Sequence, residues 1–322
     1  MACLRAGRQT QHMTISASRR SFLKLTAAAA GMTTLGVAGT AQATGSPRLT
    51  PLRIPTRAGT FDAVAAGPRN GRKVLLLHGF PELGIEWEHQ LLGLAAAGYR
   101  AVAPDQRGYS PGVRPLRIED YQLDHTVADV RAIANSLGWG RFDLVGHDWG
   151  AAVAWVAAAK YSRRVRSLTA VSVPHLGAFA EALRTDPAQQ KASEYMADFR
   201  KPAPITEDRI LAGGPPKLPG VPPEKCLKYY ERLSQPGALT SVLNWYRAND
   251  FTGYEQPVTV PTLFIASDKD PAVAPSGIAA TKNWVTGRYR LENLPGIGHN
   301  IPEQAPEATT SLLLDHLTSV RC

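Results

Sequence analysis

The sequence predicts an α/β protein with a mostly parallel sheet and helices on both faces. Short, solidly apolar runs at residues 73–77 and 100–104 are typical of strands that are buried on both sides. Residues 126–137 carry apolar side chains at helical spacing, and Gly138 follows them. Strands that alternate with helices in this way are typical of a parallel sheet with crossover helices.

The same alternation continues along the chain and is interrupted once. Between residues 174 and 257 the sequence is polar, with helical stretches around the loop GGPPKLPGVPPEK. We interpret this segment as a helical cap inserted over the ends of the strands, with residues 44–173 and 258–322 forming the core. The further elements expected in the core are strands at 142–146, 165–173, 261–267 and 288–294, and helices at 151–160 and 306–320.

The first 43 residues predict a twin-arginine export signal. Residues 18–24 read S-R-R-S-F-L-K, and an alanine-rich apolar run and the tripeptide A-Q-A follow. The apolar run is short for a spanning helix, which needs about 20 residues. We expect a periplasmic or extracellular protein with no stable membrane association after cleavage; the alternatives are an uncleaved anchor or a basic tail. Translation can start at Met1 or at Met13.

The composition argues against nucleic-acid and metal partners. The formal net charge is +9, but the first 43 residues hold five basic residues and no acid, so the remainder carries +4. No block of Lys and Arg with interleaved aromatic residues remains, and no Cys/His cluster has metal-ligand spacing. Cys226 and Cys322 remain after cleavage, and export permits a disulfide that their positions do not establish.

Residues 146–150, Gly-His-Asp-Trp-Gly, predict a nucleophile elbow between a strand and a helix. Glycine two positions before and after Asp148 permits a very sharp turn that lifts this side chain clear of the sheet. The N-terminus of the following helix favours negative charge there. The alternative is an ordinary strand–helix turn with a capping aspartate.

Aspartate at this position indicates the class of reaction. An ionised carboxylate needs no base to act as a nucleophile, but at an acyl carbon it would give an anhydride. At a saturated carbon that bears a leaving oxygen or halide it gives a stable ester, which water must then cleave. Asp148 therefore indicates alkyl transfer, with epoxides or alkyl halides as substrates.

Two later segments supply groups that can activate water. His299 lies beside Gly298 in a loop before the final helix, and Asp268 and Asp270 follow the strand expected at 261–267. The order nucleophile, acid, histidine is that of the α/β-hydrolases. We expect His299 to be the base, whereas spacing alone leaves both aspartates open.

The loop after the strand at 73–77 has the sequence His78-Gly79-Phe80-Pro81. Such a loop can supply one backbone N–H to an oxyanion hole, and the residue after the nucleophile supplies the other. We therefore expect the amides of Phe80 and Trp149 to form this hole and their side chains to line an apolar substrate slot. His78 is expected to have a structural role within the loop.

Taken together, these stretches resemble the epoxide hydrolases of the α/β-hydrolase superfamily. The resemblance runs from about residue 52 to residue 317, and it implies the α/β-hydrolase fold with a helical cap. It also favours Asp270 over Asp268 as the acid. The stretches that carry it are HGFPE (78–82), AGYRAVAPDQRGYS (97–110), GHDWGA (146–151), YSRRVRSLTAVSVPH (161–175) and LNWYRA (243–248).

The resemblance further implies two cap tyrosines that hydrogen-bond the epoxide oxygen and protonate the leaving alkoxide. LNWYRA matches the family motif at Tyr246, and SEYMADFRKP (193–202) places Tyr195 at the other position. Tyr229 and Tyr230 are the alternatives for the first tyrosine. The implied reaction converts a small apolar epoxide to a vicinal diol through an ester on Asp148, with no metal or organic cofactor.

The main alternative is a haloalkane or haloacid dehalogenase that uses the same nucleophile, because HGFP and GHDWG are shared with that group. A ligand-binding module that has lost catalysis is a more distant alternative. Two departures from the family pattern, Asn300 after the histidine and the ILAGGPPKLPGVPP stretch (210–223), affect the expected substrate shape more than the chemistry.

Overall fold

The computed structural model describes residues 47–320 and is built around an eight-stranded sheet in the order β1-β2-β4-β3-β5-β6-β7-β8. β1 and β2 pair antiparallel, β2 is antiparallel to β4, and all other neighbouring strands are parallel. The expected mostly parallel sheet is thus confirmed. The strands are β1 (Thr50–Thr56), β2 (Gly59–Ala66), β3 (Lys73–Leu77), β4 (Arg100–Pro104), β5 (Phe142–His147), β6 (Val165–Val171), β7 (Thr262–Ser267) and β8 (Tyr289–Leu294).

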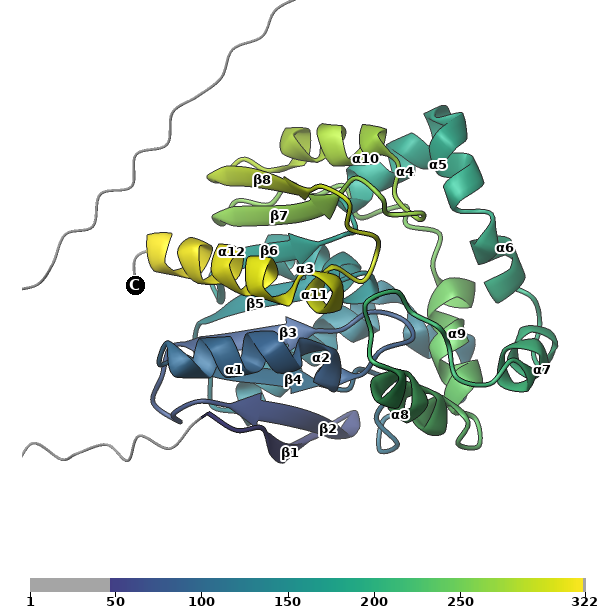
Figure 1. Cartoon of the computed structure of the whole chain (residues 1–322), viewed down its shortest axis with the longest axis horizontal. Helices are drawn as coiled ribbons and strands as arrows, with labels where there is room; N and C mark the ends of the chain where they lie inside the picture. The colour runs from purple at the N-terminus through teal and green to yellow at the C-terminus, as the bar shows by residue number, and fades with distance from the viewer. Residues whose placement is uncertain (1–46, 321–322) are drawn as a thin grey trace, which may run out of the picture. The chain divides into compact units, whose positions relative to one another are not determined.

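Helices cover both faces of the sheet, as expected (Figure 1). α1 (Glu88–Ala96) and α12 (Pro306–Ser319) lie together on one face, and Leu91 and Leu313 belong to the same buried cluster as Val74 and Leu76 of β3. α2 (Leu123–Ser136) and α3 (Trp149–Lys160) lie on the other face, in the core cluster that contains Leu75 and Leu77. Successive residues of β3 therefore enter opposite cores, which is why this strand is apolar throughout.

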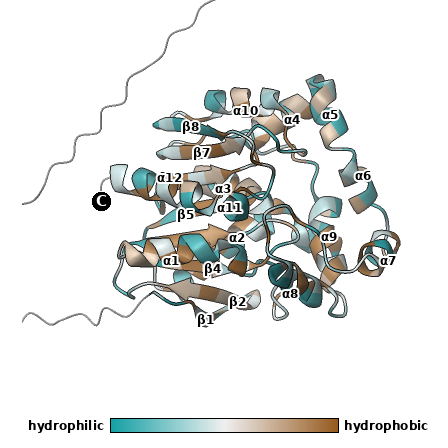
Figure 2. Cartoon of the chain, viewed as in Figure 1, coloured by the Kyte–Doolittle hydropathy of each residue, from teal (hydrophilic) through white to brown (hydrophobic). Residues whose placement is uncertain are grey.

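Six helices follow β6 and precede β7, in the segment interpreted as a cap. In Figure 1, α5 to α9 lie beyond the carboxyl ends of the parallel strands, and Figure 2 shows the central strands in brown whereas α8 is largely teal. The residue boundaries of the cap stay a prediction. The helices are α4 (Leu176–Thr185), α5 (Pro187–Ala192), α6 (Tyr195–Phe199), α7 (Ile205–Ala212), α8 (Pro223–Leu233) and α9 (Ala238–Ala248).

Three differences from the sequence-based expectations concern ends and edges. The pair β1–β2 was not predicted. β6 ends at Val171, two residues earlier than expected, because Ser172 leaves the strand with φ of 69°. The helix expected from residue 126 begins at Leu123. Short elements complete the fold: α10 (Pro275–Ala280), α11 (Ile301–Gln304) and the 3-10 turns at Gly84–Trp87, Ile118–Tyr121 and Thr281–Trp284.

Some of the sequence-based expectations concern residues at the ends of the chain. The export signal at 1–43 and Cys322 lie outside the described residues, whereas Cys226 is buried with a free thiol. Within residues 47–320, no helix combines the length and apolar character needed to cross a bilayer.

Candidate active site

The elbow at Asp148 is a strained turn that the glycines on either side of it permit. Asp148 lies between β5 and α3 with φ of 49° and ψ of −120°, a conformation that is costly for a residue with a side chain. A Cβ on Gly146 would lie 2.1 Å from the carbonyl oxygen of Gly150, so the tight approach of α3 to β5 requires glycine. The turn holds the Asp148 carboxylate at the carboxyl edge of the sheet.

His299 bridges two carboxylates. Its Nε2 lies 3.4 Å from Oδ2 of Asp148, and its Nδ1 lies 2.9 Å from Oδ2 of Asp270. Asp268 takes no part, since its Oδ1 accepts a hydrogen bond from the amide of Gly296. The structure thus places Asp270, the acid implied by the family resemblance, against the histidine.

The charges of Asp148, His299 and Asp270 stabilise one another. Burial alone would raise the pKa of Asp148, but the hydrogen bond and charge of His299 outweigh burial and hold that pKa below its usual value. Burial alone would lower the pKa of His299, but the carboxylates of Asp270 and Asp148 raise it well above its usual value. At neutral pH the group is therefore an imidazolium between two carboxylates, and Asp148 is ionised.

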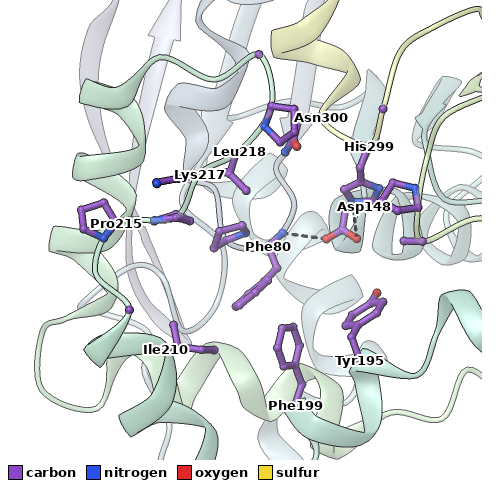
Figure 3. A pocket seen from close by; sticks show the side chains of 18 of the residues that line it. Phe80, Asp148, Tyr195, Phe199, Ile210, Pro215, Lys217, Leu218, His299 and Asn300 are labelled. Carbon is purple, nitrogen blue, oxygen red and sulfur yellow. Dashed lines mark hydrogen bonds and ion pairs between the residues drawn. The ribbon is translucent and has the colours of Figure 1, made fainter.

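The loop after β3 supplies the first expected oxyanion-hole amide. The backbone N–H of Phe80 donates a hydrogen bond of 2.9 Å to Oδ1 of Asp148 (Figure 3). This approach depends on Gly79, because a Cβ there would lie 2.6 Å from Cβ of Asp148. The second expected residue, Trp149, begins α3, and its buried indole packs edge-on against Tyr246 with ring centroids 5.1 Å apart.

Tyr195 of α6 and Tyr246 of α9 come together on the cap side, with ring centroids 6.2 Å apart. Both line the cavity that contains Asp148, and Figure 3 shows the Tyr195 hydroxyl turned toward Asp148. Burial, together with the negative charge of Asp148, raises the pKa of both phenols, so both remain proton donors at neutral pH.

The two alternative tyrosines are engaged elsewhere. The Tyr229 hydroxyl is 3.2 Å from Oε1 of Glu303, and the Tyr230 hydroxyl donates to the carbonyl of Leu211. Tyr230 does line the cavity, but its hydroxyl is satisfied by backbone. The geometry therefore favours Tyr195 as the partner of Tyr246.

A cavity of about 1150 Å³ lies between the sheet and the cap helices (Figure 3). At the end that contains Asp148, the rings of Phe80, Phe199 and Tyr246 pack against one another, with Phe80–Phe199 centroids 5.3 Å apart and Phe199–Tyr246 centroids 4.9 Å apart. Its walls are mainly apolar, which suits an apolar ligand held by few polar groups. His299 and Asn300 also line it.

Ser172 belongs to the site although no sequence signal marked it. Its hydroxyl donates to Oδ2 of Asp270 at 2.7 Å and lies 3.0 Å from Nδ1 of His299, from which it can accept. These contacts hold the carboxylate and the ring in one orientation. They also give a reason for the unfavourable backbone conformation of Ser172 at the end of β6.

A buried acidic cluster behind His299 was also not predicted. Oε1 of Glu82 accepts from Asn300 at 2.6 Å, and His147 Nε2 donates to the carbonyl of His299 at 2.9 Å. Nδ1 of His147 lies 2.5 Å from Oε1 of Glu86, and both side chains are fully buried.

A further buried acid, Glu303, connects α8 of the cap to the segment that carries His299. Lys225 of α8 forms an ion pair of 3.0 Å with Oε1 of Glu303, and Tyr229 contacts the same oxygen. Glu303 lies in α11, four residues after His299. The position of α8 is thereby tied to the segment that carries the histidine.

Comparisons with known proteins agree with this architecture. Residues 73–306 match the family described as the alpha/beta hydrolase fold. Epoxide hydrolase A of Mycobacterium tuberculosis is 32% identical over 80% of this chain and 94% of its own length. AB hydrolase superfamily protein YfhM of Bacillus subtilis is 36% identical over 80% of this chain and 94% of its own length.

Solved structures give the same result. An epoxide hydrolase of the α/β hydrolases superfamily, from metagenomes of hot environments, superposes with a TM-score of 0.76 at 28% identity, covering 83% of this chain and 98% of that one. Fold and site define an α/β-hydrolase whose elbow carries aspartate. With the sequence relationships above, this chain belongs to the epoxide hydrolases of the α/β-hydrolase family.

The buried acids predict a stability that falls as the pH rises. Burial, with the charge of Glu86, raises the pKa of Glu82 to about 8, and burial raises the pKa of Glu303 to about 7. The folded protein therefore keeps protons that unfolded glutamates release at about pH 4.5, and it loses stability between that pH and about 8. For one such group the loss reaches about 3 kcal/mol over two pH units.

We expect Glu82→Gln to flatten this decline, measured as the change in the free energy of unfolding from pH 6 to pH 8. The amide keeps an acceptor for Asn300 and has no proton to lose. Glu181→Gln, on the exposed surface of α4, is the control and should leave the slope unchanged. A Glu82→Gln slope equal to that of the wild type would contradict this account of the cluster.

Proposed function

We propose that the protein hydrolyses epoxides to vicinal diols through a hydroxyalkyl ester on Asp148. The observation that carries this proposal is the placement of an ionised carboxylate at the elbow, opposite two protonated tyrosines and beside a His299–Asp270 pair. Each component has a distinct task in such a reaction. The relatives named above, called epoxide hydrolases, support the same reaction class.

In the first step Asp148 attacks an epoxide carbon. Its Oδ1 accepts from the Phe80 amide, so we assign the attack to Oδ2, which lies 3.4 Å from Nε2 of His299. The C–O bond of the ring breaks as the new C–Oδ2 bond forms, and the ring oxygen takes a proton from Tyr195 or Tyr246. A released alkoxide is strongly basic, and this proton transfer avoids it.

The second step depends on the change in charge at Asp148. Esterification removes one of the two carboxylate charges that raise the pKa of His299, so the imidazolium becomes more acidic. Its proton can then pass through solvent to the tyrosine that protonated the ring oxygen, and this restores the phenol. Neutral His299, oriented by Asp270 and Ser172, then takes a proton from water. The hydroxide attacks the ester carbonyl carbon of Asp148.

The resulting oxyanion develops at Oδ1, where the Phe80 amide already donates. We assign the second donor to the Trp149 amide, as the elbow geometry implies. The bond from the Asp148 carbonyl carbon to the substrate oxygen breaks, and that oxygen takes the proton from His299 to complete the diol. Asp148, left as a carboxylic acid, then passes its proton to His299, which restores the carboxylate and the imidazolium. One epoxide and one water give one diol.

A dehalogenase is the less favoured alternative. A halide leaves as a weak base and requires hydrogen-bond donors but no proton. The paired tyrosines, both kept protonated by burial, are suited to an oxygen leaving group.

Two variants separate the two steps. Asp148→Ala should abolish diol formation without unfolding the protein. His299→Gln should form the ester but hydrolyse it at least about 10²-fold more slowly, because general-base catalysis is lost. Intact-protein mass spectrometry after mixing with styrene oxide should show a mass increase of one epoxide in His299→Gln only.

Asp268→Asn is the matched control for the acid, since Asp268 follows the same strand but contacts Gly296. It should retain turnover, whereas Asp270→Asn should lose most of it. Rapid ester hydrolysis by His299→Gln would remove the role proposed for the histidine.

We also infer that the protein is exported by the twin-arginine route. The support is the S-R-R-S-F-L-K stretch followed by an apolar run and A-Q-A at residues 41–43. N-terminal sequencing of the protein recovered from outside the cytoplasm should begin at Thr44. An N-terminus upstream of the twin arginines in that fraction would contradict the inference.

A further inference from the structure

The two outer strands of the sheet differ in what their free edges offer. β1 lies at one edge of the sheet and β8 at the other (Figure 1). β1 contains Pro51 and Pro55, which have no amide hydrogen to donate to a further strand, and proline is one of the residues that protect the edges of natural sheets. β8 has the sequence YRLENL and contains no proline. This form of protection is therefore present at β1 and missing from β8.

The backbone of β8 directs polar groups outward from the sheet. The amide of Thr262 in β7 donates to the carbonyl of Arg288, which sets the side of the strand that faces β7. Because the backbone groups of successive residues in a strand point to opposite sides, Tyr289, Leu291 and Asn293 direct their N–H and C=O groups away from β7. Among residues 47–320, no strand pairs with this outer side of β8. The outer side is a template on which a further strand can pair.

The side chains of β8 leave this edge accessible and charged. Arg290, Leu291 and Asn293 are exposed, and Leu291 keeps 39% of its surface in solvent. Arg290 and Glu292 lie on the same face of the strand, with Nε of the arginine 2.6 Å from Oε1 of the glutamate. A strand that pairs with β8 will therefore meet one positive and one negative side chain on that face.

A second copy of β8 matches this pattern when it runs antiparallel about a two-fold axis at Leu291. Leu291 then lies opposite its counterpart and Tyr289 opposite Asn293, and these outward-facing residues can exchange main-chain hydrogen bonds. Arg290 lies opposite Glu292 in the non-hydrogen-bonded positions, where side chains of the two strands are closest. The four charges alternate in sign around the axis, so each has opposite charges as its neighbours along and across the strands.

Other positions of the axis do not give this complementarity. An axis at Arg290 or at Glu292 would place that residue opposite its own like charge. An axis at Tyr289 would place Arg288 opposite Arg290, and an axis at Asn293 would place Glu292 opposite a leucine. Charged side chains on an edge strand normally oppose association, but here they favour it in the register centred on Leu291. A self-complementary patch of this kind is what a two-fold dimer requires.

We propose that the outer edge of β8 is a docking surface for a second copy of this chain. The two sheets join antiparallel through β8, with Leu291 at the two-fold axis and two Arg290–Glu292 pairs across it. The contact is short, so the dimer is weak and forms as the protein concentration rises. The inference does not depend on the reaction proposed at Asp148.

The test is the molar mass of the protein in solution over a concentration series, measured by sedimentation velocity. The wild type should change from monomer to dimer as the concentration rises. Arg290→Glu makes the edge wholly acidic and Glu292→Arg makes it wholly basic, so two attractive pairs become repulsive in either homodimer. The dissociation constant of each variant should rise at least about tenfold. Arg53→Glu reverses an exposed charge on the opposite edge strand, β1, and is the matched control that should dimerise as the wild type does.

A mixture of the two charge-reversal variants tests the register itself. In a mixed dimer, each acidic side chain of the Arg290→Glu chain lies opposite a basic side chain of the Glu292→Arg chain. An equimolar mixture should therefore show the mass of a dimer at concentrations where each variant alone is monomeric. Leu291→Pro removes an outward N–H without changing any charge, and it should prevent dimerisation of the otherwise wild-type chain.

A wild type that stays monomeric at every concentration would overturn the proposal. A dimer that both charge reversals leave intact, or that Arg53→Glu dissociates, would place the contact elsewhere and would also overturn it. A mixture of Arg290→Glu and Glu292→Arg that stays monomeric, although circular dichroism shows both variants folded, would contradict the antiparallel register centred on Leu291.

Discussion

The position of His299 between two carboxylates is the interaction on which the rest of the site depends. With Asp148 ionised, the two acids keep the ring protonated, and the ring keeps the buried nucleophile charged. Once Asp148 is an ester, one of those charges is gone and the same ring can act as a base. The nucleophile thus sets the protonation of the histidine that later releases it.

The sheet brings the catalytic side chains together at one edge. The four strands β5, β6, β7 and β8 are consecutive neighbours in the sheet, and they are followed by Asp148, Ser172, Asp270 and His299 respectively. Parallel neighbours end at the same edge, so residues that are far apart in sequence converge there. The cap then adds the tyrosines from α6 and α9 and closes the cavity over that edge. Lys225 and Gln304 tie the cap side to the segment around His299.

The parts that the sequence predicted are those with strong local patterns. The solidly apolar strands and the paired glycines around Asp148 mark the sheet and the elbow without any tertiary information. β1 was missed because TPLRIPT contains two prolines, which a strand tolerates at a sheet edge, and β1 is an edge strand.

Tertiary contacts explain why the other features of the site could not be predicted from the sequence. Spacing alone did not separate Asp268 from Asp270; the family resemblance favoured Asp270, and in the structure it is Asp270 that contacts His299. Ser172 and the cluster of Glu82, Glu86 and His147 acquire their roles from neighbours that are distant in sequence. A single serine or glutamate carries no local signal of such a partner, so spacing could not identify them.

The most direct test of a covalent ester is the fate of oxygen in a single turnover. Unlabelled enzyme in excess over epoxide would be allowed to react in ¹⁸O-water. If Asp148 forms the ester, the diol should contain no ¹⁸O, and the peptide that contains Asp148 should gain the label. A labelled diol with an unlabelled Asp148 peptide would show that water attacks the epoxide directly, and it would contradict the roles of Asp148 as nucleophile and of His299 as the base that releases the ester.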